Sequence, residues 1–131
     1  MDSQTILLVE GDDILAEVTS FRLELLGYRV QHEASAEAAL AYIEQSPPGL
    51  IILDLYLPGL DGVELVNRLK ADDSTTKIPL MVFSVDADLT VVERAFAAGA
   101  DDYVVIPYDP AVLQEKVARL LEDTSAVSLA K

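Results

Sequence analysis

Acidic side chains gather directly after the first apolar run of the chain, Ile6–Val9. Glu10, Asp12 and Asp13 fall within four positions, and Gly11 lies among them. Carboxylates this close repel one another unless a cation, a proton or hydrogen-bond donors offset their charge. The stretch therefore indicates either part of a cation site or a site from which Gly11 has removed one ligand.

Other polar groups follow later apolar runs in the same way. Asp54, Ser84 and the pair Ile106-Pro107 each stand where such a run ends. A carboxylate at the end of a buried strand needs a cation, hydrogen bonds or a raised pKa. Asp54 is therefore a candidate reactive group, although a plain capping role in the following loop accounts for it equally well.

The hydrophobic pattern predicts the elements that position these groups. Short apolar runs predict buried strands at Ile6–Val9, Leu50–Leu53, Leu80–Phe83 and Tyr103–Ile106, and an alternating stretch predicts an edge strand at Tyr28–His32. Helical spacing and capping residues predict helices from Asp12 or Asp13 to Gly27, at Ser35–Gln45, from Asp61, at Asp86–Ala98 and from Asp109. Strand and helix thus alternate five times, which is typical of a parallel sheet with helices on both faces. Polar groups past the carboxyl ends of the strands then meet in one crevice.

Apolar positions inside the predicted helices repeat with helical spacing. They are Ile14, Val18, Phe21 and Leu25 in the first helix, Leu65, Val66 and Leu69 in the third, and Leu113, Val117 and Leu120 in the fifth. In the fourth helix we expect one side to face the sheet and a second to stay largely apolar, namely Leu89, Val92 and Phe96 against Val91, Ala95 and Ala98.

Composition limits the class of protein. The chain has 131 residues, 51% of them hydrophobic, which suits one folded domain. We place that domain at residues 1–122 and expect residues 123–131 to be a frayed tail or the start of a linker. The net charge of −14 disfavours direct binding to nucleic acid or anionic membranes. No apolar run approaches the ~20 residues of a membrane-spanning helix, and the lack of cysteine suits a cytoplasmic location.

Two motifs in the second half of the chain carry a resemblance to a known family. They are DLYLPGLDG at residues 54–62 and AGADDY at residues 98–103, and Ser84 lies 30 residues after Asp54. With them, residues 5 to about 122 resemble the receiver domain of bacterial response regulators, the phosphoacceptor half of two-component signalling. The resemblance implies a flavodoxin-like α/β fold with strand order 2-1-3-4-5. It also implies a signalling switch rather than an enzyme.

The resemblance assigns roles to individual residues. Asp54 stands where receivers take a phosphoryl group from a histidine kinase or a phosphotransfer protein. Ser84 stands at the hydroxyl position that bonds the phosphate, and Tyr103 at the aromatic switch. A carboxylate attacks phosphorus when a cation and donors neutralise the charge on the transferring oxygens. The ligands implied for a weakly bound Mg²⁺ are Glu10, Asp12, Asp54 and the backbone carbonyl of Tyr56.

Partners follow from the same resemblance. In receivers, the face built from the fourth helix, the fifth strand and the fifth helix contacts protein partners or a second receiver. Apolar residues scattered over a surface are common, so this face could also be ordinary surface.

Two positions depart from the family pattern. Gly11 stands where a second metal-binding acid is expected, and Ile106 stands where receivers have a lysine before the proline. One interpretation keeps phosphorylation, with Mg²⁺ held by the remaining ligands. The other is a degenerate receiver that acts by protein contact alone. Because one negative and one positive charge are lost together, the two departures resemble a site whose charge has been re-balanced.

His32 is the only histidine of the chain. It lies in the predicted edge strand, so we expect it to be solvated and remote from the crevice. A role as a catalytic base or a metal ligand is not indicated.

Overall fold

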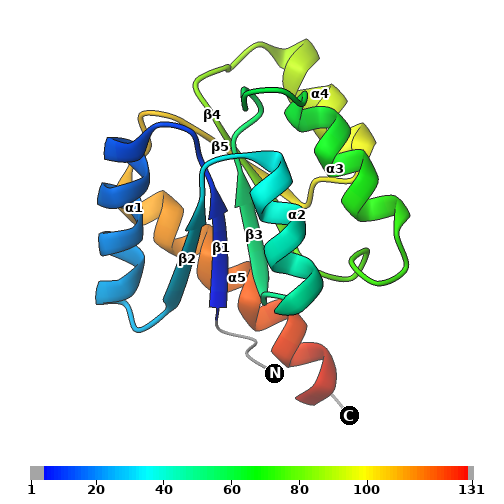
Figure 1. Cartoon of the computed structure of the whole chain (residues 1–131). Helices are drawn as coiled ribbons and strands as arrows, with labels where there is room; N and C mark the ends of the chain where they lie inside the picture. The colour runs from blue at the N-terminus through cyan, green and yellow to red at the C-terminus, as the bar shows by residue number, and fades with distance from the viewer. Residues whose placement is uncertain (1–4, 130–131) are drawn as a thin grey trace.

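The computed structural model describes the backbone of residues 5–129 and the side chains of residues 5–122. Within these residues, five strands and five helices alternate (Figure 1): β1 Thr5–Val9, α1 Asp13–Leu25, β2 Arg29–Glu33, α2 Ala36–Gln45, β3 Leu50–Leu53, α3 Gly62–Ala71, β4 Leu80–Ser84, α4 Leu89–Ala98, β5 Asp102–Val105 and α5 Pro110–Leu129. The strands form one parallel sheet in the order β2-β1-β3-β4-β5. The predicted alternation and strand order are confirmed.

Helices cover both faces of the sheet, as Figure 1 shows. Alternate residues of β1 point to opposite faces: Leu7 and Val9 pack with α2, α3 and α4, whereas Ile6 and Leu8 pack with α1 and α5. Strands β1, β3 and β4 are buried along their whole length, which explains why their sequences are continuous apolar runs. None of the helices in the described part of the chain combines the length and apolar character that crossing a membrane requires.

Aspartate and serine caps set where several helices begin. The side chain of Asp12 accepts from two backbone amides of α1, Ser35 caps α2, and Asp61 caps α3. Helix α4 begins three residues later than the sequence predicted, because Asp88 caps it through the Thr90 amide. A cap at the start fixes the direction in which each helix leaves the sheet edge.

The apolar stripe of α1 faces solvent, whereas the apolar stripe of a surface helix usually faces the core. The helix packs on the sheet through Ala16, Thr19 and Leu23, and the predicted apolar positions lie on the opposite side. Their exposed fractions are 75% for Ile14, 45% for Val18, 60% for Phe21 and 70% for Leu25. Small residues let the helix approach the sheet closely, and the Thr19 hydroxyl hydrogen bonds to that of Tyr108 at 3.0 Å.

The orientation predicted for α4, with Leu89, Val92 and Phe96 facing the sheet, was wrong. Ala95 is fully buried, and Val91 and Val92 are half-buried, whereas Leu89 and Phe96 are 70% and 44% exposed. The small Ala95 side chain lets α4 lie close to the sheet, which turns the large residues outward. In α3, by contrast, the residues predicted to face inward are buried: Leu65, Val66 and Leu69. The apolar residues predicted at helical spacing in α5 are also buried: Leu113, Val117 and Leu120.

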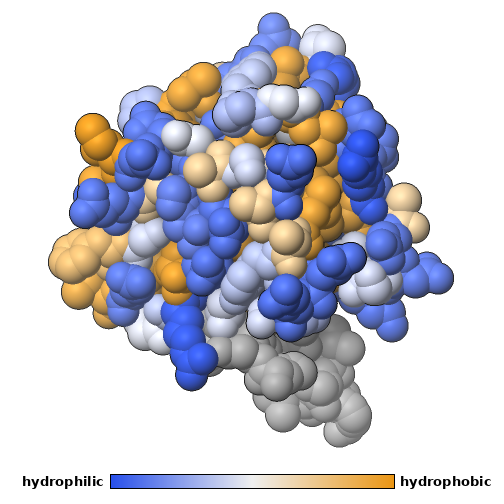
Figure 2. All heavy atoms as spheres, viewed as in Figure 1, coloured by the Kyte–Doolittle hydropathy of each residue, from blue (hydrophilic) through white to orange (hydrophobic). Residues whose placement is uncertain are grey.

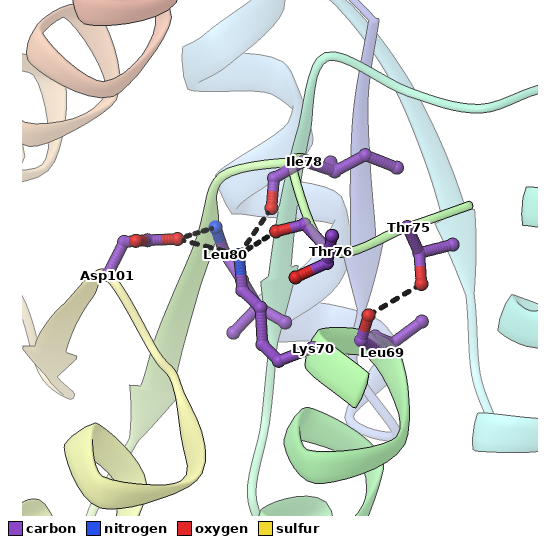
Figure 3. A network of polar contacts seen from close by, with 7 residues as sticks. All are labelled: Leu69, Lys70, Thr75, Thr76, Ile78, Leu80 and Asp101. Atoms are coloured by element: carbon purple, nitrogen blue, oxygen red, sulfur yellow. Dashed lines mark hydrogen bonds and ion pairs between the residues drawn. The ribbon is translucent and has the colours of Figure 1, made fainter. Parts of the chain in front are cut away.

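A polar network joins α3 to the amino ends of β4 and β5 (Figure 3). Lys70 Nζ donates to the carbonyls of Thr76 at 3.1 Å and Ile78 at 2.8 Å, and it pairs with Asp101 Oδ2 at 3.1 Å. The same Asp101 oxygen accepts from the Leu80 amide at 2.9 Å. The lysine of α3 thus satisfies polar groups of two other segments, the loop between α3 and β4 and the loop between α4 and β5.

Helix α5 runs to Leu129 and includes residues 123–129, which the sequence assigned to a tail or linker. The division of the chain at residue 122 stays a prediction.

Candidate functional site

The predicted polar groups lie together beyond the carboxyl ends of the strands. Glu10 follows β1 and its amide donates to the Glu33 carbonyl at 3.0 Å. Asp54 follows β3 and its amide donates to the Val9 carbonyl at 3.0 Å. Ser84 ends β4. Because these bonds continue the parallel ladder by one residue, the two carboxylates leave the sheet from adjacent strands.

Glu10 is a buried acid with an unsatisfied oxygen. Only 3% of the residue is exposed, and Oε2 accepts from the Asp12 amide at 3.1 Å. Oε1 is buried and has no hydrogen-bond partner among the residues that the structure describes. Burial is the largest cause that raises the pKa of Glu10 to about 7; the neighbouring Asp54 carboxylate acts in the same direction, and the bond from the Asp12 amide acts against both. The group therefore favours a proton or a cation beside it.

The side chain of Asp12 is directed to the helix rather than to this pair of acids. Its Oδ1 accepts from the amides of Ile14 at 3.0 Å and Leu15 at 3.1 Å. Within the described residues, no three acidic, histidine or cysteine side chains gather closely enough to hold a metal ion. The structure thus brings Glu10 and Asp54 together and leaves Asp12 as the cap of α1.

The loop after β3 holds Asp54 in place. Asp54 is half-buried, and its Oδ1 accepts from the Tyr56 amide at 3.1 Å. The Gly62 amide donates back to the Leu55 carbonyl at 2.9 Å. A Cβ on Gly62 would come within 2.3 Å of Leu55 Cα, so no other residue fits the last position of the DLYLPGLDG motif without moving the loop.

Asp86 links two tyrosines over the crevice, and the sequence did not single it out. Tyr103 is 8% exposed, and its hydroxyl donates to the Asp86 carbonyl at 2.7 Å. The Tyr56 hydroxyl donates to the Asp86 carboxylate, which raises the pKa of Tyr56 to about 12 and lowers that of Asp86. Ser84 is fully buried, and its Oγ accepts from the Asp86 amide at 3.1 Å. The sequence signal that could have identified Asp86 is its position two residues after Ser84, the candidate phosphate-binding hydroxyl.

His32 was wrongly expected to lie far from the crevice. It is half-buried, and its Nε2 hydrogen bonds to the Glu10 carbonyl at 2.7 Å, so the ring nitrogen is the donor. Strand β2 lies beside β1, with His32 opposite Leu8, which brings the ring to the crevice edge. His32 therefore supports the backbone from which Glu10 projects.

The two departures from the family pattern lie at the same crevice. Gly11 is exposed, and a Cβ there would meet Pro58 Cδ at 3.7 Å and the Ala34 carbonyl at 3.8 Å, which are ordinary contacts. Ile106 is half-buried and packs against the core between the sheet and helices α1 and α5. A side chain thus fits at position 11, and the residue at position 106 is held by apolar contacts.

The arrangement fits a divalent cation with few protein ligands. Glu10 Oε1 is a buried oxygen that has no partner in the part of the chain described by the structure, and the Glu10 carboxylate lies beside that of Asp54. Mg²⁺ prefers oxygen ligands, uses one or two carboxylates and keeps several waters. The carboxylates of Glu10 and Asp54 and a backbone carbonyl of the β3–α3 loop are therefore ligands of the type and number that Mg²⁺ uses.

Comparison with known proteins places the whole domain in one family. Residues 6–118 match the response regulator receiver domain. The chain is 38% identical over 120 residues to the transcriptional regulatory protein CseB of Streptomyces coelicolor, covering 92% of this chain and 50% of that protein. It is 36% identical over 120 residues to the phosphate regulon transcriptional regulatory protein PhoB of Pseudomonas aeruginosa, covering 92% of this chain and 51% of that protein. The chain thus spans about half the length of the curated relatives it matches.

Solved structures agree in fold. A response regulator from Chloroflexus aurantiacus superposes with a TM-score of 0.87 at 34% identity, covering 91% of this chain and 98% of the other. The receiver domain of the sensor histidine kinase PA1611 of Pseudomonas aeruginosa, solved with a magnesium ion coordinated in its active-site cleft, gives a TM-score of 0.83 at 30% identity, covering 91% and 98%. Sequence and structure together show that this chain belongs to the response regulator receiver domain family.

Proposed function

We propose that this chain is a cytoplasmic signalling switch in which Asp54 accepts a phosphoryl group, with a weakly bound Mg²⁺ beside it. One observation carries the proposal: Glu10 Oε1 is buried, has no hydrogen-bond partner among the described residues, and belongs to a carboxylate that lies beside that of Asp54 at the end of the central strand. Such a pair is costly without a positive charge, and it supplies the oxygen ligands that a phosphoryl-transfer site needs. The proposed role is signalling rather than catalysis.

The proposed transfer uses residues that the fold already aims at the crevice. An oxygen of Asp54 would bond to phosphorus while the bond from phosphorus to the donor nitrogen, on a histidine kinase or phosphotransfer protein, breaks. Ser84 Oγ would donate to a phosphoryl oxygen, and Tyr103 would stay packed inward behind it. Mg²⁺, held by Glu10, Asp54 and the Tyr56 carbonyl, would neutralise charge on the transferring oxygens.

A second candidate function is protein contact without phosphorylation, and Ile106 favours it. The residue stands where the family has a cationic partner for the phosphoryl group, and its apolar contacts with the core occupy that position instead. Without that cation, a phosphorylated Asp54 would lose a charge-assisted hydrogen bond. In this alternative, the domain keeps the receiver shape and binds its partner constitutively.

The proposed partners differ in where they bind. A phosphoryl donor would approach the crevice. A protein partner or a second receiver would bind the α4–β5–α5 face, where Leu89, Phe96, Val105 and Val112 are exposed. The named relatives are transcriptional regulators, and this acidic domain is proposed to affect DNA only through another domain or subunit.

Intact mass measurement with a small acyl-phosphate donor and Mg²⁺ tests the proposal. We expect a low level of adduct with the mass of one phosphoryl group in the unmodified protein and none in Asp54→Asn. Asp73→Asn, an exposed aspartate in the loop after α3, is the matched control and should label like the unmodified protein. An adduct that persists in Asp54→Asn would contradict the assigned acceptor, and no adduct in any variant would favour the constitutive alternative.

A further inference from the structure

A cleft of about 610 Å³ lies between the β3–α3 loop and helix α4. The apolar part of its lining includes Leu57, Pro58, Val63 and Val91. In Figure 2, apolar atoms are visible among hydrophilic ones at the end of the molecule where Figure 1 places α4 and the start of α3. A cleft of this size, mostly apolar and with a few polar groups, is typical of a site for a small molecule.

The cleft also holds an acid and a base, Asp61 and Arg94. Arg94 Nη2 lies 4.0 Å from Asp61 Oδ2, which is longer than a hydrogen bond, and the two side chains are 57% and 59% exposed. The other oxygen, Asp61 Oδ1, accepts from the Val63 amide at 2.9 Å, so the cap of α3 orients the carboxylate. An exposed pair at this distance contributes little to stability, and both charges can therefore pair with a ligand instead.

Tyr56 adds an aromatic ring to the lining. The residue is 57% exposed, and hydrogen bonds hold it at both ends: its amide donates to Asp54 Oδ1 at 3.1 Å, and its hydroxyl donates to the Asp86 carboxylate. Because the ring is already held in place, a second ring can pack against it without the cost of ordering a free side chain. The cleft therefore offers three kinds of contact: an aromatic face, a cation and an anion.

We propose that this cleft binds a free aromatic amino acid. The ligand carboxylate pairs with Arg94, its ammonium group pairs with Asp61 Oδ2, and its ring packs against Tyr56 and the apolar lining. A free amino acid carries both charges on one carbon atom, which matches an acid and a base whose nearest atoms are 4.0 Å apart. A residue inside a peptide carries neither charge, so a protein segment fits the cleft less well. The inference does not depend on phosphorylation of Asp54.

Fluorescence anisotropy of L-tryptophan tests the inference, because the chain itself contains no tryptophan. Titration of a fixed concentration of L-tryptophan with the full chain should give a dissociation constant on the order of 0.1–1 mM, as expected for a ligand of this size. Tryptamine lacks the carboxylate, and indole-3-propionate lacks the ammonium group. Each should bind at least about fivefold more weakly than L-tryptophan, because each loses one ion pair.

Two variants locate the ligand in the cleft. Arg94→Gln should weaken L-tryptophan binding at least about fivefold without weakening that of tryptamine, which has no carboxylate to lose its partner. Asp61→Asn keeps an oxygen for the cap of α3, and it should weaken L-tryptophan binding without weakening that of indole-3-propionate. Arg22→Gln is the matched control, because it makes the same change at an exposed arginine of α1. It should bind L-tryptophan like the unmodified chain.

Circular dichroism establishes that the variants remain folded. No rise in anisotropy with the unmodified chain, equal affinities for the three ligands, or an unchanged affinity in Arg94→Gln would overturn the inference. Asp54→Asn should bind L-tryptophan like the unmodified chain, since its side-chain oxygen still accepts from the Tyr56 amide. Failure of the phosphorylation proposal would therefore leave this result unchanged.

Discussion

The two ends of the parallel sheet hold polar groups of opposite character. At the amino ends of β4 and β5, Lys70 pairs with Asp101 and donates to two carbonyls, so the cation and its acceptors are matched. At the carboxyl ends, Glu10 and Asp54 lie together, and one buried Glu10 oxygen has no partner among the described residues. The described residues thus satisfy the buried polar groups at the amino ends of the strands and leave one buried carboxylate oxygen without a partner at the carboxyl ends.

In our proposal, the difference separates groups that hold the fold together from groups that bind a ligand. A matched buried network stabilises the native state only while all its members remain. An unmatched pair of acids lowers stability and gains it back when a cation binds. Removing the central residue of each region should therefore have opposite effects on the free energy of unfolding.

The largest expected effect is at Lys70. Lys70→Met keeps the apolar stem and removes the charge, which leaves the Thr76 and Ile78 carbonyls without this donor and Asp101 without its ion pair. We expect a loss of about 3 kcal/mol in the free energy of unfolding, measured by urea denaturation. Lys77→Met, at an exposed lysine on the following loop, is the matched control and should change stability by less than about 0.5 kcal/mol. Equal effects of the two variants would contradict the contrast between the amino and carboxyl ends of the sheet.

At Glu10 the expected sign is reversed. Glu10→Gln removes the buried charge, so it should stabilise the protein by about 2 kcal/mol above pH 7. The pKa of Glu10 is raised in the folded state to about 7 from an ordinary value of 4.5. The folded state therefore holds a proton that the unfolded state has released, and this contribution to stability is full below pH 4.5 and lost as pH rises to about 7.

Urea denaturation across this pH range measures the effect. The difference between Glu10→Gln and the unmodified protein should grow with pH and become constant above pH 7. Glu17→Gln, at an exposed glutamate of α1, should show no such trend. A Glu10→Gln variant that is less stable at pH 8 would mean that the carboxylate is matched by a partner.

A smaller effect is expected at Gly11. There is room for a Cβ at this position, so Gly11→Asp adds a carboxylate at the crevice without displacing the loop. We expect Mg²⁺ to bind about tenfold more tightly, because one more oxygen ligand is supplied. Tyrosine fluorescence titration measures the affinity, and Gly11→Ala controls for the change in backbone. If Gly11→Asp binds no more tightly than Gly11→Ala, the remaining ligands already complete the site.

Much of this fold was predictable, because a strand of a parallel sheet is buried on both faces and its sequence is therefore a continuous apolar run. The caps at Asp12 and Asp61 were equally visible. The rotation of α1 and α4 was not, because a helix that packs through Ala16 or Ala95 leaves its larger apolar residues outside. Hydrophobicity alone does not say which of two apolar sides meets the sheet.

The sequence predicted which residues meet at the crevice, but it did not predict their individual hydrogen bonds. Strand order determines that Glu10, Asp54 and Ser84 converge. It does not determine that the Asp12 side chain is used as a helix cap, nor that Asp86 receives both tyrosines. Those choices depend on competing hydrogen bonds within a few residues of chain, and the sequence offers several of them.

The central claim is that the crevice is a phosphoryl-acceptor site whose charge has been re-balanced at Gly11 and Ile106. It is tested most directly by acyl-phosphate labelling, with Mg²⁺ held constant, of Gly11→Asp, Ile106→Lys and the double variant. The double variant regains a ligand and a phosphate partner, so it should label more than either single variant, and only while Asp54 is present. Its stability in urea should exceed the sum of the single effects by about 0.5–3 kcal/mol, because the new charges pair. Labelling that does not rise, with stabilities that add within error, would contradict the account.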